Sequence, residues 1–164
     1  FLDAVSLCRQ AGVTLIPTFV AFHPWLTLDG YCDLLDTIAA LDLVDHVAPI
    51  QLAIRLLIPA GSRLLELDEV RAMAASFDPK TLTHRWVHRH PEVDRLHEQV
   101  NAIVGARLAA DRRVVFAEIS RLAHEAAGLE GPPPPDPSRR VPVPYVTEPW
   151  YCCAEPNPEQ VGLV

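Results

Sequence analysis

The sequence predicts an α/β fold, on two observations. A helical pattern, an apolar run, a second helical pattern and a second apolar run follow one another over residues 1–58. This alternation is typical of parallel strands joined by crossover helices. The remainder of the 164-residue chain has a helical pattern and then becomes rich in proline. We expect barrel strands in residues 1–67, a helical extension in 68–128, a linker in 129–149 and a tail in 150–164.

The first unit begins with a predicted helix over residues 1–11, whose apolar residues recur at helical spacing. Gly12 suits the end of this helix. Residues 13–22 are a nearly continuous apolar and β-branched run, which predicts a strand buried on both faces. Pro17 argues against that strand because proline donates no hydrogen bond to a sheet. Residues 23–25 follow as a turn.

The second unit begins at Thr27, a predicted N-cap for a helix that runs to about Leu43. Residues 47–58 are the second predicted strand, in which alternate residues belong to opposite faces. One face is aliphatic and should pack on outer helices: Ile50, Leu52, Ile54, Leu56 and Ile58. The other face should point into a barrel: Gln51, Ala53, Arg55 and Leu57.

Two parallel strands do not close a barrel, since a complete (β/α) barrel takes roughly 200 residues or more. By themselves they would leave both edges of the sheet open. The simplest interpretation is the last portion of a larger α/β barrel whose first strands precede Phe1. Active sites lie at the carboxyl ends of barrel strands, so Phe22, His23 and Trp25 should share a rim with the segment Pro59 to Arg63.

Three further helices are predicted beyond the second strand: Asp68 to Phe77, Pro91 to about Ala110, and a helix capped by Asp111 that runs to Ala127. Gly128 should end the last of these. The run Pro132 to Pro135 then predicts a semi-rigid, extended spacer.

Arg55 is the residue of the second strand that most needs a partner, because a buried guanidinium is costly unless an anion meets it. Two interpretations stay open. Arg55 contacts a bound anionic or polar ligand, or it forms an internal salt bridge to a strand outside this chain.

Charge and hydropathy exclude some classes of partner. The net charge of −7 argues against nucleic acid or an anionic membrane. No uninterrupted apolar stretch approaches the ~20 residues of a membrane span. The cysteines occur only at positions 8, 32, 152 and 153, which is too few and too uneven for a secreted disulfide framework. We expect a cytoplasmic protein.

Two segments and the tail resemble one enzyme family. The segment Pro17 to Trp25, and the segment Val47 to Pro59 with Gly61-Ser62, resemble the late barrel strands of radical S-adenosylmethionine (SAM) enzymes. The ending Cys152-Cys153-Ala154-Glu155-Pro156 is similar to the tail of the CCAEP group of radical SAM proteins. Some members of that group have CUAEP there, with selenocysteine at the position of Cys153.

The resemblance implies a partial (β/α)6 TIM-like barrel, a 4Fe–4S cluster on a C-x3-C-x2-C loop, and SAM that yields a 5′-deoxyadenosyl radical for hydrogen abstraction. This sequence contains no C-x3-C-x2-C, so the cluster ligands are expected upstream and the chain should be inactive without them. The resemblance also implies that the wall near SAM is lined by Gln51, Arg55, Ile58 and Pro59. The expected partners are the N-terminal half of the same protein and a small-molecule or peptide substrate of unknown identity.

The adjacent thiols of Cys152 and Cys153 follow the proline-rich spacer and are the candidate catalytic and metal-ligating residues, for redox chemistry or soft-metal binding. Trp150 and Tyr151 are candidates to dock this arm on the body. Cys8 and Cys32 lie in predicted helices and are expected to be buried, inert thiols.

The histidines at 84, 88, 90 and 97 invite a metal hypothesis, but polar residues around a helix start explain them more simply. His23 is expected to be structural, although its place on the rim leaves a functional role open. Two rival hypotheses remain for the whole chain. One is a non-catalytic α/β domain whose Cys-Cys tail binds a metal or a partner protein, and the other is a carrier or regulatory domain unrelated to radicals.

Overall fold

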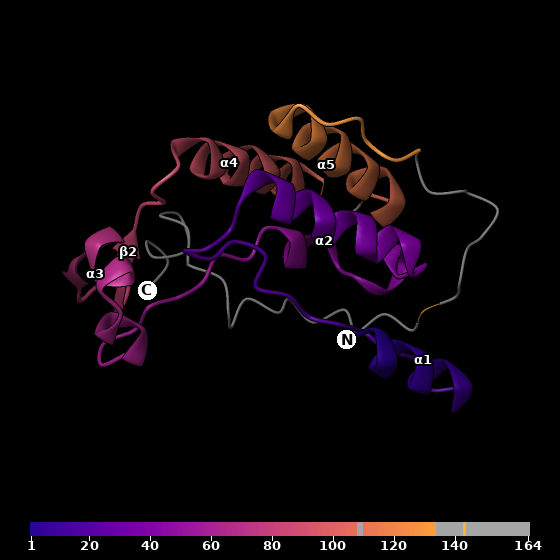
Figure 1. Ribbon diagram of the computed structural model, residues 1–164, viewed down its shortest axis with the longest axis horizontal. Coiled ribbons are helices and arrows are strands. Elements are labelled where there is room, and N and C mark those ends of the chain that lie inside the picture. The colour runs from indigo at the N-terminus through magenta and orange to yellow at the C-terminus, as the bar shows by residue number, and fades with distance from the viewer. Residues whose placement is uncertain (108–109, 134–142, 144–164) are drawn as a thin grey trace.

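The computed structural model describes residues 1–107, 110–133 and 143. Its α-helices are α1 (Leu2–Gln10), α2 (Leu28–Ala40), α3 (Asp68–Met73), α4 (Pro91–Ala106) and α5 (Arg112–Ala127). Its strands are β1 (Ala74–Asp78) and β2 (Thr83–Trp86), and its 3₁₀ turns are Val44–His46, Pro49–Leu52 and Arg63–Glu66. Helix α1 lies at one end, α3 and the β1–β2 hairpin lie at the other, and α2, α4 and α5 lie between them (Figure 1).

The helix ends follow the capping signals of the sequence. The Thr27 hydroxyl oxygen accepts a hydrogen bond from the Gly30 N–H at 3.0 Å, so α2 begins as predicted. The Asp111 carboxylate accepts from the Arg113 N–H at 2.9 Å, and α5 ends at Gly128 in the left-handed region with φ 68°. Pro91 is the first residue of α4, where a missing N–H costs nothing.

The main core lies where α2, α4 and α5 pack together over the turns at residues 43–53. Each helix contributes apolar side chains at helical spacing. The buried positions include Leu35 and Ile38 of α2, Val93, Leu96, Val100 and Val104 of α4, and Val115, Ile119 and Ala123 of α5. A smaller core of Ile58, Val70 and Trp86 holds the hairpin end together.

The two predicted parallel strands are reduced to a single rung. The Phe22 N–H donates to the Ile54 carbonyl at 2.9 Å, and the Leu56 N–H donates to the Phe22 carbonyl at 2.8 Å. This is the hydrogen-bond pattern of a parallel pair between Phe22 and Arg55. Regular strands over 13–22 and 47–58 were therefore wrong as predictions. The described residues contain no closed barrel.

Proline explains why the rest of each run leaves the ladder. Pro17 has no N–H to donate, and Pro49 begins a 3₁₀ turn that tightens residues 49–52. The side chain of Gln51 then replaces a strand carbonyl, because its Oε1 accepts from the Phe19 N–H at 3.1 Å. The predicted two faces of this segment do not alternate in burial, since Gln51, Leu52, Ala53, Ile54 and Arg55 are all buried.

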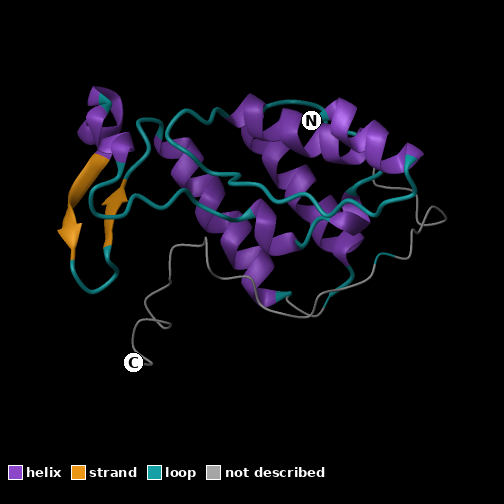
Figure 2. Cartoon of the chain, turned by 90° about the horizontal axis from the view of Figure 1, so that it is seen from below, coloured by secondary structure: helices purple, strands orange, loops and turns teal. Residues whose placement is uncertain are grey.

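The hairpin of β1 and β2 was not predicted, and the predicted helix Asp68 to Phe77 was wrong beyond Met73. Ala74 and Ala75 favour helix intrinsically, but pairing with the β-branched and aromatic residues of β2 overrides that preference. The register pairs Ala74 with Trp86 and Asp78 with Thr83, with an irregularity between them. The helical extension therefore contains a two-stranded sheet, which lies beside α3 and apart from α2, α4 and α5 in Figure 2.

A line of backbone pairing connects the hairpin to the parallel rung. Pro59 forms an antiparallel bridge with Thr83, and the His84 N–H donates to the Ile58 carbonyl at 2.7 Å. The segment 54–59 thus lies between Phe22 on one side and β2 on the other. No helix in the described ranges is both long and apolar enough to cross a membrane.

Candidate functional site

The candidate site lies beside the parallel bridge between Phe22 and Arg55, next to His23, the residue that follows Phe22. Three elements converge there: the pair itself, the end of β2 at Trp86, and the first turns of α4. Segment 54–59 is held in this position because it is bonded to Phe22 on one side and to β2 on the other.

Arg55 is the centre of this site and is 8% exposed. One guanidinium nitrogen donates to Asp94 Oδ1 at 2.8 Å, and another donates to the Trp86 carbonyl at 2.8 Å. The guanidinium also lies 3.7 Å from the centroid of the Trp86 ring, a cation–π contact. The Trp86 ring is fixed in turn, since its Nε1–H donates to the Leu56 carbonyl at 2.8 Å. Arg55 is therefore held in one position by contacts within this chain.

The anionic partner of Arg55 is Asp94 of α4, which is neither a ligand nor a strand outside the chain. Asp94 has both carboxylate oxygens engaged, because Oδ2 accepts from the His88 N–H at 2.9 Å. The acid thus connects the parallel pair to the loop that follows β2. The Arg55–Asp94 ion pair is mostly shielded from water, with side-chain exposures of 9% for Arg55 and 20% for Asp94.

His97 lies one helical turn beyond Asp94 and contacts both segments of the pair. Its Nε2–H donates to the Ala53 carbonyl at 3.2 Å, and its ring meets Phe22 edge-on at a centroid distance of 4.8 Å. Burial, followed by the positive charge of Arg55, lowers the pKa of His97 to about 4. This imidazole is neutral at physiological pH.

Two more histidines lie on the rim. His88 is 3% exposed, and its Nδ1 accepts from the His90 N–H at 3.0 Å. His23 is half-buried, and its Nδ1 accepts from the Trp25 N–H at 3.3 Å. Burial, and then the neighbouring His88, lower the pKa of His23 below its usual value.

The predicted wall residues are in or beside this site, and all but Pro59 are buried within the chain. Gln51 is buried and bonded to the Phe19 backbone, Ile58 belongs to the smaller core, and Pro59 is exposed beside Thr83. The structure brings Arg55, Ile58 and Pro59 into one segment next to β2, whereas Gln51 precedes it in a 3₁₀ turn.

The predicted catalytic and metal-ligating residues Cys152 and Cys153, with Trp150 and Tyr151, lie outside the described residues. Cys32 is buried in α2 as expected, and burial followed by nearby Asp36 raises the pKa of its thiol to about 11. Cys8 of α1 is half-buried, which corrects the expectation of a buried thiol. Neither thiol lies in the Arg55 site.

Over residues 1–107, 110–133 and 143, no group of three or more histidine, cysteine, aspartate or glutamate side chains is placed to hold a metal ion. His84, His88, His90 and His97 separate accordingly. His84 lies on β2 and binds the Ala75 carbonyl through Nδ1 at 3.0 Å, while His97 faces Phe22. The rings of His88 and His90 are 5.6 Å apart.

Sequence reasoning missed Asp94, Trp86 and His97 as site residues. A signal existed for His97, because it lies four residues after Val93 and three before Val100 and so falls on the buried stripe of α4. No comparable signal marks Asp94, whose role depends on a contact 39 positions away in sequence.

A cavity of about 520 Å³ lies between the end of α2, α5 and residues 129–133. Its walls are mainly apolar and include Phe116, Leu129 and Pro132. Buried His124 lines it, with Nδ1–H donating to the Ser120 carbonyl at 2.8 Å and Nε2 lying 3.3 Å from Asp36.

Searches of protein families, curated proteins and solved structures find no match to this chain.

Proposed function

We propose that this chain forms the C-terminal part of a radical SAM enzyme of the CCAEP/CUAEP-tail group, whose intact form abstracts a substrate hydrogen with a 5′-deoxyadenosyl radical. The proposal starts from the resemblance of the two segments and the tail. The observation that carries it further is the parallel rung between Phe22 and Arg55. Parallel neighbours need a crossover of a dozen or more residues, and α2 supplies one of 13 residues.

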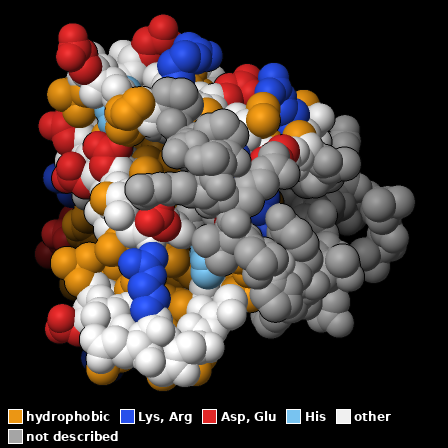
Figure 3. All heavy atoms as spheres, turned by 90° about the vertical axis from the view of Figure 1, so that its right-hand side faces the viewer, with side chains coloured by type: hydrophobic (Ala, Val, Ile, Leu, Met, Phe, Trp, Pro, Cys, Tyr) orange, Lys and Arg blue, Asp and Glu red, His pale blue; other side chains and the backbone are white. Residues whose placement is uncertain are grey.

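An exposed apolar surface supports a larger barrel. Helix α1 buries only Val5 among its residues, and apolar side chains before the rung also face solvent. The members of this surface are Phe1, Leu2, Leu7, Val13, Ile16 and Val20, each at least 42% exposed. Hydrophobic side chains lie open on the α1 side of the molecule, which faces the viewer in Figure 3. The N-terminal half of the same protein is the partner that would cover them.

The described residues do not fit a 4Fe–4S cluster. They include two cysteines, Cys8 on α1 and Cys32 on α2, and no trio of ligating side chains. Nor do they offer an open SAM site at Gln51 or Arg55, since both side chains are bonded within the chain. The role proposed for this chain is therefore to complete the wall and rim of the barrel, with the cluster ligands upstream.

The Cys152-Cys153 pair is proposed as a redox or ligating accessory. This role is tested by measuring iron content and product formation in the intact protein, prepared without oxygen. The Cys152→Ser/Cys153→Ser double variant should keep its 4Fe–4S cluster and lose product formation, whereas the matched Cys8→Ser/Cys32→Ser variant should keep both. Unchanged product formation in the Cys152→Ser/Cys153→Ser variant would rule out a catalytic role for this cysteine pair. An intact protein that binds no cluster would overturn the family proposal.

One observation favours the rival hypothesis of a non-catalytic α/β domain. Arg55, the polar residue expected to face a ligand, is neutralised by Asp94 and stacked on Trp86. In that case the Cys-Cys tail binds a metal or a partner protein. Zinc titration of the 164-residue chain, followed by calorimetry, tests this hypothesis. Binding that the Cys152→Ser/Cys153→Ser variant abolishes and the Cys8→Ser/Cys32→Ser variant retains would support it.

A further inference from the structure

We propose that the cavity between α2, α5 and residues 129–133 binds a neutral, mainly apolar small molecule that carries a hydrogen-bond acceptor. The inference depends on the contacts of Ser120 and His124 and on the charges around the cavity, and not on the radical SAM proposal. The volume of about 520 Å³ lies within the range of roughly 300–1,000 Å³ that is usual for small-molecule sites.

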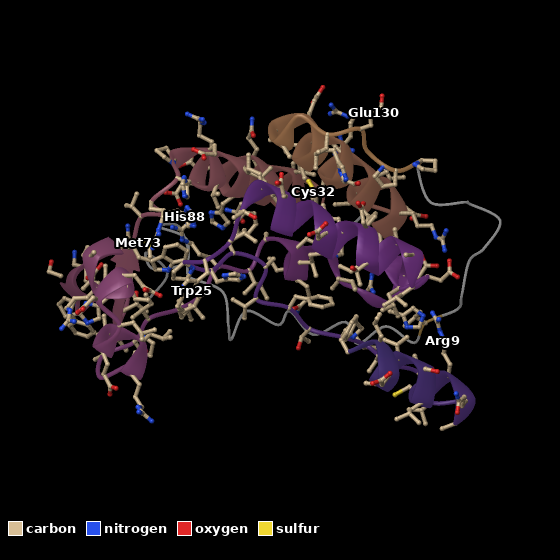
Figure 4. All side chains as sticks on the ribbon, in the orientation of Figure 1. Arg9, Trp25, Cys32, Met73, His88 and Glu130 are labelled. Atoms are coloured by element: carbon tan, nitrogen blue, oxygen red, sulfur yellow. The ribbon has the colours of Figure 1, made fainter. Side chains whose placement is uncertain are left out.

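One face of α5 and the chain that follows this helix form two walls of the cavity. Phe116, Ser120 and His124 are spaced four residues apart, so they share a face of α5, and all three are buried. After the helix the chain turns back along α5, and a Cβ on Gly131 would lie 3.4 Å from the His124 side chain. Figure 4 labels Glu130 on this returning segment. The end of α5 therefore fixes both walls.

The hydroxyl of Ser120 is a buried donor that lacks an acceptor. His124 Nδ1 lies 2.8 Å from the Ser120 carbonyl oxygen, which can only accept, so Nδ1 carries a hydrogen and donates it. The Ser120 hydroxyl oxygen contacts the same Nδ1 at 3.5 Å, where it too can only accept, and it has no other hydrogen-bond partner among the described residues. Ser120 is 6% exposed and lines the cavity. An unpaired buried donor is unfavourable, and a ligand in the cavity can supply the acceptor.

The charges around the cavity favour a neutral ligand. Each ionisable side chain of the wall lies within 3.3 Å of a side chain that can carry the opposite charge: Glu118 with Arg107, Arg121 with Glu125, and His124 with Asp36. A charged ligand would have to compete with one of these pairs. Apart from Ser120, the rest of the wall is apolar, so most of the ligand surface should be apolar as well.

The test is a titration of the 164-residue chain, followed by nuclear magnetic resonance of the backbone amides of residues 116–124. Four aromatic probes of similar size are used. Acetophenone is neutral and carries a carbonyl acceptor, ethylbenzene is neutral without an acceptor, and benzoate and benzylammonium are charged. We expect saturable shifts of these amides with the two neutral probes, and none with the two charged probes at the same concentrations.

Three variants separate the hydroxyl from the cavity. Ser120→Ala should weaken acetophenone binding on the order of threefold or more and leave ethylbenzene binding unchanged, because it removes only the donor. Ala117→Leu adds volume to the wall and should weaken binding of both probes. Ser6→Ala removes an exposed hydroxyl of α1 and should bind both probes as the parent does.

Four results would overturn the proposal: no saturable shift with acetophenone, parent affinity for acetophenone in Ser120→Ala, a charged probe that binds as tightly as acetophenone, or shifts of the same amides that depend on protein concentration without a probe. The last result would assign the cavity to a second copy of the chain. Neither SAM nor an iron–sulfur cluster is present in this assay. Its failure is therefore distinguishable from failure of the proposed function.

Discussion

Arg55 shows how a buried charge is accommodated by residues far apart in the sequence. Its guanidinium has a carboxylate, a carbonyl and an aromatic face as partners, supplied by α4 and β2. That Arg55 needs an anionic partner could be predicted from the sequence, since an isolated buried guanidinium is unfavourable. That the partner is Asp94 could not, because the pairing depends on how α4 packs on the parallel segments.

Replacing Arg55 should destabilise the chain strongly. Arg55→Ala leaves Asp94 mostly buried without its cation, so we expect a loss of about 2–3 kcal/mol in the free energy of unfolding. Urea denaturation measures it. The control is Arg121→Ala, which removes an exposed pair with Glu125 and should change stability by less than about 0.5 kcal/mol. Equal effects in the two variants would contradict the role given to Arg55.

His97 should make stability depend on pH in a defined window. Its pKa is near 6.5 in the unfolded chain and about 4 in the folded one, because burial disfavours the charged ring. Between these values the unfolded chain binds more protons, so stability falls as pH drops from 6.5 toward 4. The loss should be on the order of 3 kcal/mol. Urea denaturation at several pH values measures it, and His97→Gln should lose this component while shared carboxylate titrations remain.

At the scale of elements, helices were predicted better than strands. The caps at Thr27, Asp111 and Gly128 are local signals, and the structure uses each of them. The segments around Pro17 and Pro49 carry apolar and β-branched residues, but their proline positions interrupt regular pairing. The β1–β2 hairpin could not be predicted from the alanines of β1, since its register depends on partners in β2.

The cap of α2 gives a prediction at this scale. Thr27→Ala removes the oxygen that accepts from the Gly30 N–H, so the free energy of unfolding should fall by about 1 kcal/mol. Thr27→Ser retains the hydroxyl and should stay within about 0.5 kcal/mol of the parent. Thermal and urea unfolding measure both. If serine and alanine proved equally destabilising, the cap would not be the cause.

For the whole molecule, the main feature is a side with exposed apolar side chains. The helical layer closes over α2, α4 and α5, whereas α1 and residues 13–20 keep large apolar side chains in solvent. The sequence predicts two open strand edges, and this prediction was wrong for the second segment, because residues 54–59 are bridged to Phe22 on one side and to β2 on the other. Which side stays open required the structure.

Substitutions on the open side should act differently in the chain and in the intact protein. Ile16→Lys and Val20→Lys change exposed residues, so unfolding of the 164-residue chain should shift by less than about 0.5 kcal/mol. The intact protein should lose at least about 1–2 kcal/mol, since a lysine would enter a buried contact. Leu129→Lys, at similar exposure elsewhere, should be neutral in both. Neutrality of all three in the intact protein would mean that this side stays uncovered.

We propose that the chain completes the barrel of a radical SAM enzyme whose cluster ligands lie upstream. The most direct measurement is cleavage of SAM by the intact protein, reconstituted without oxygen and reduced with dithionite. We expect 5′-deoxyadenosine to form with the intact protein and not with the 164-residue chain. An intact protein that carries a 4Fe–4S cluster yet forms no 5′-deoxyadenosine, or one that contains no cluster at all, would contradict it.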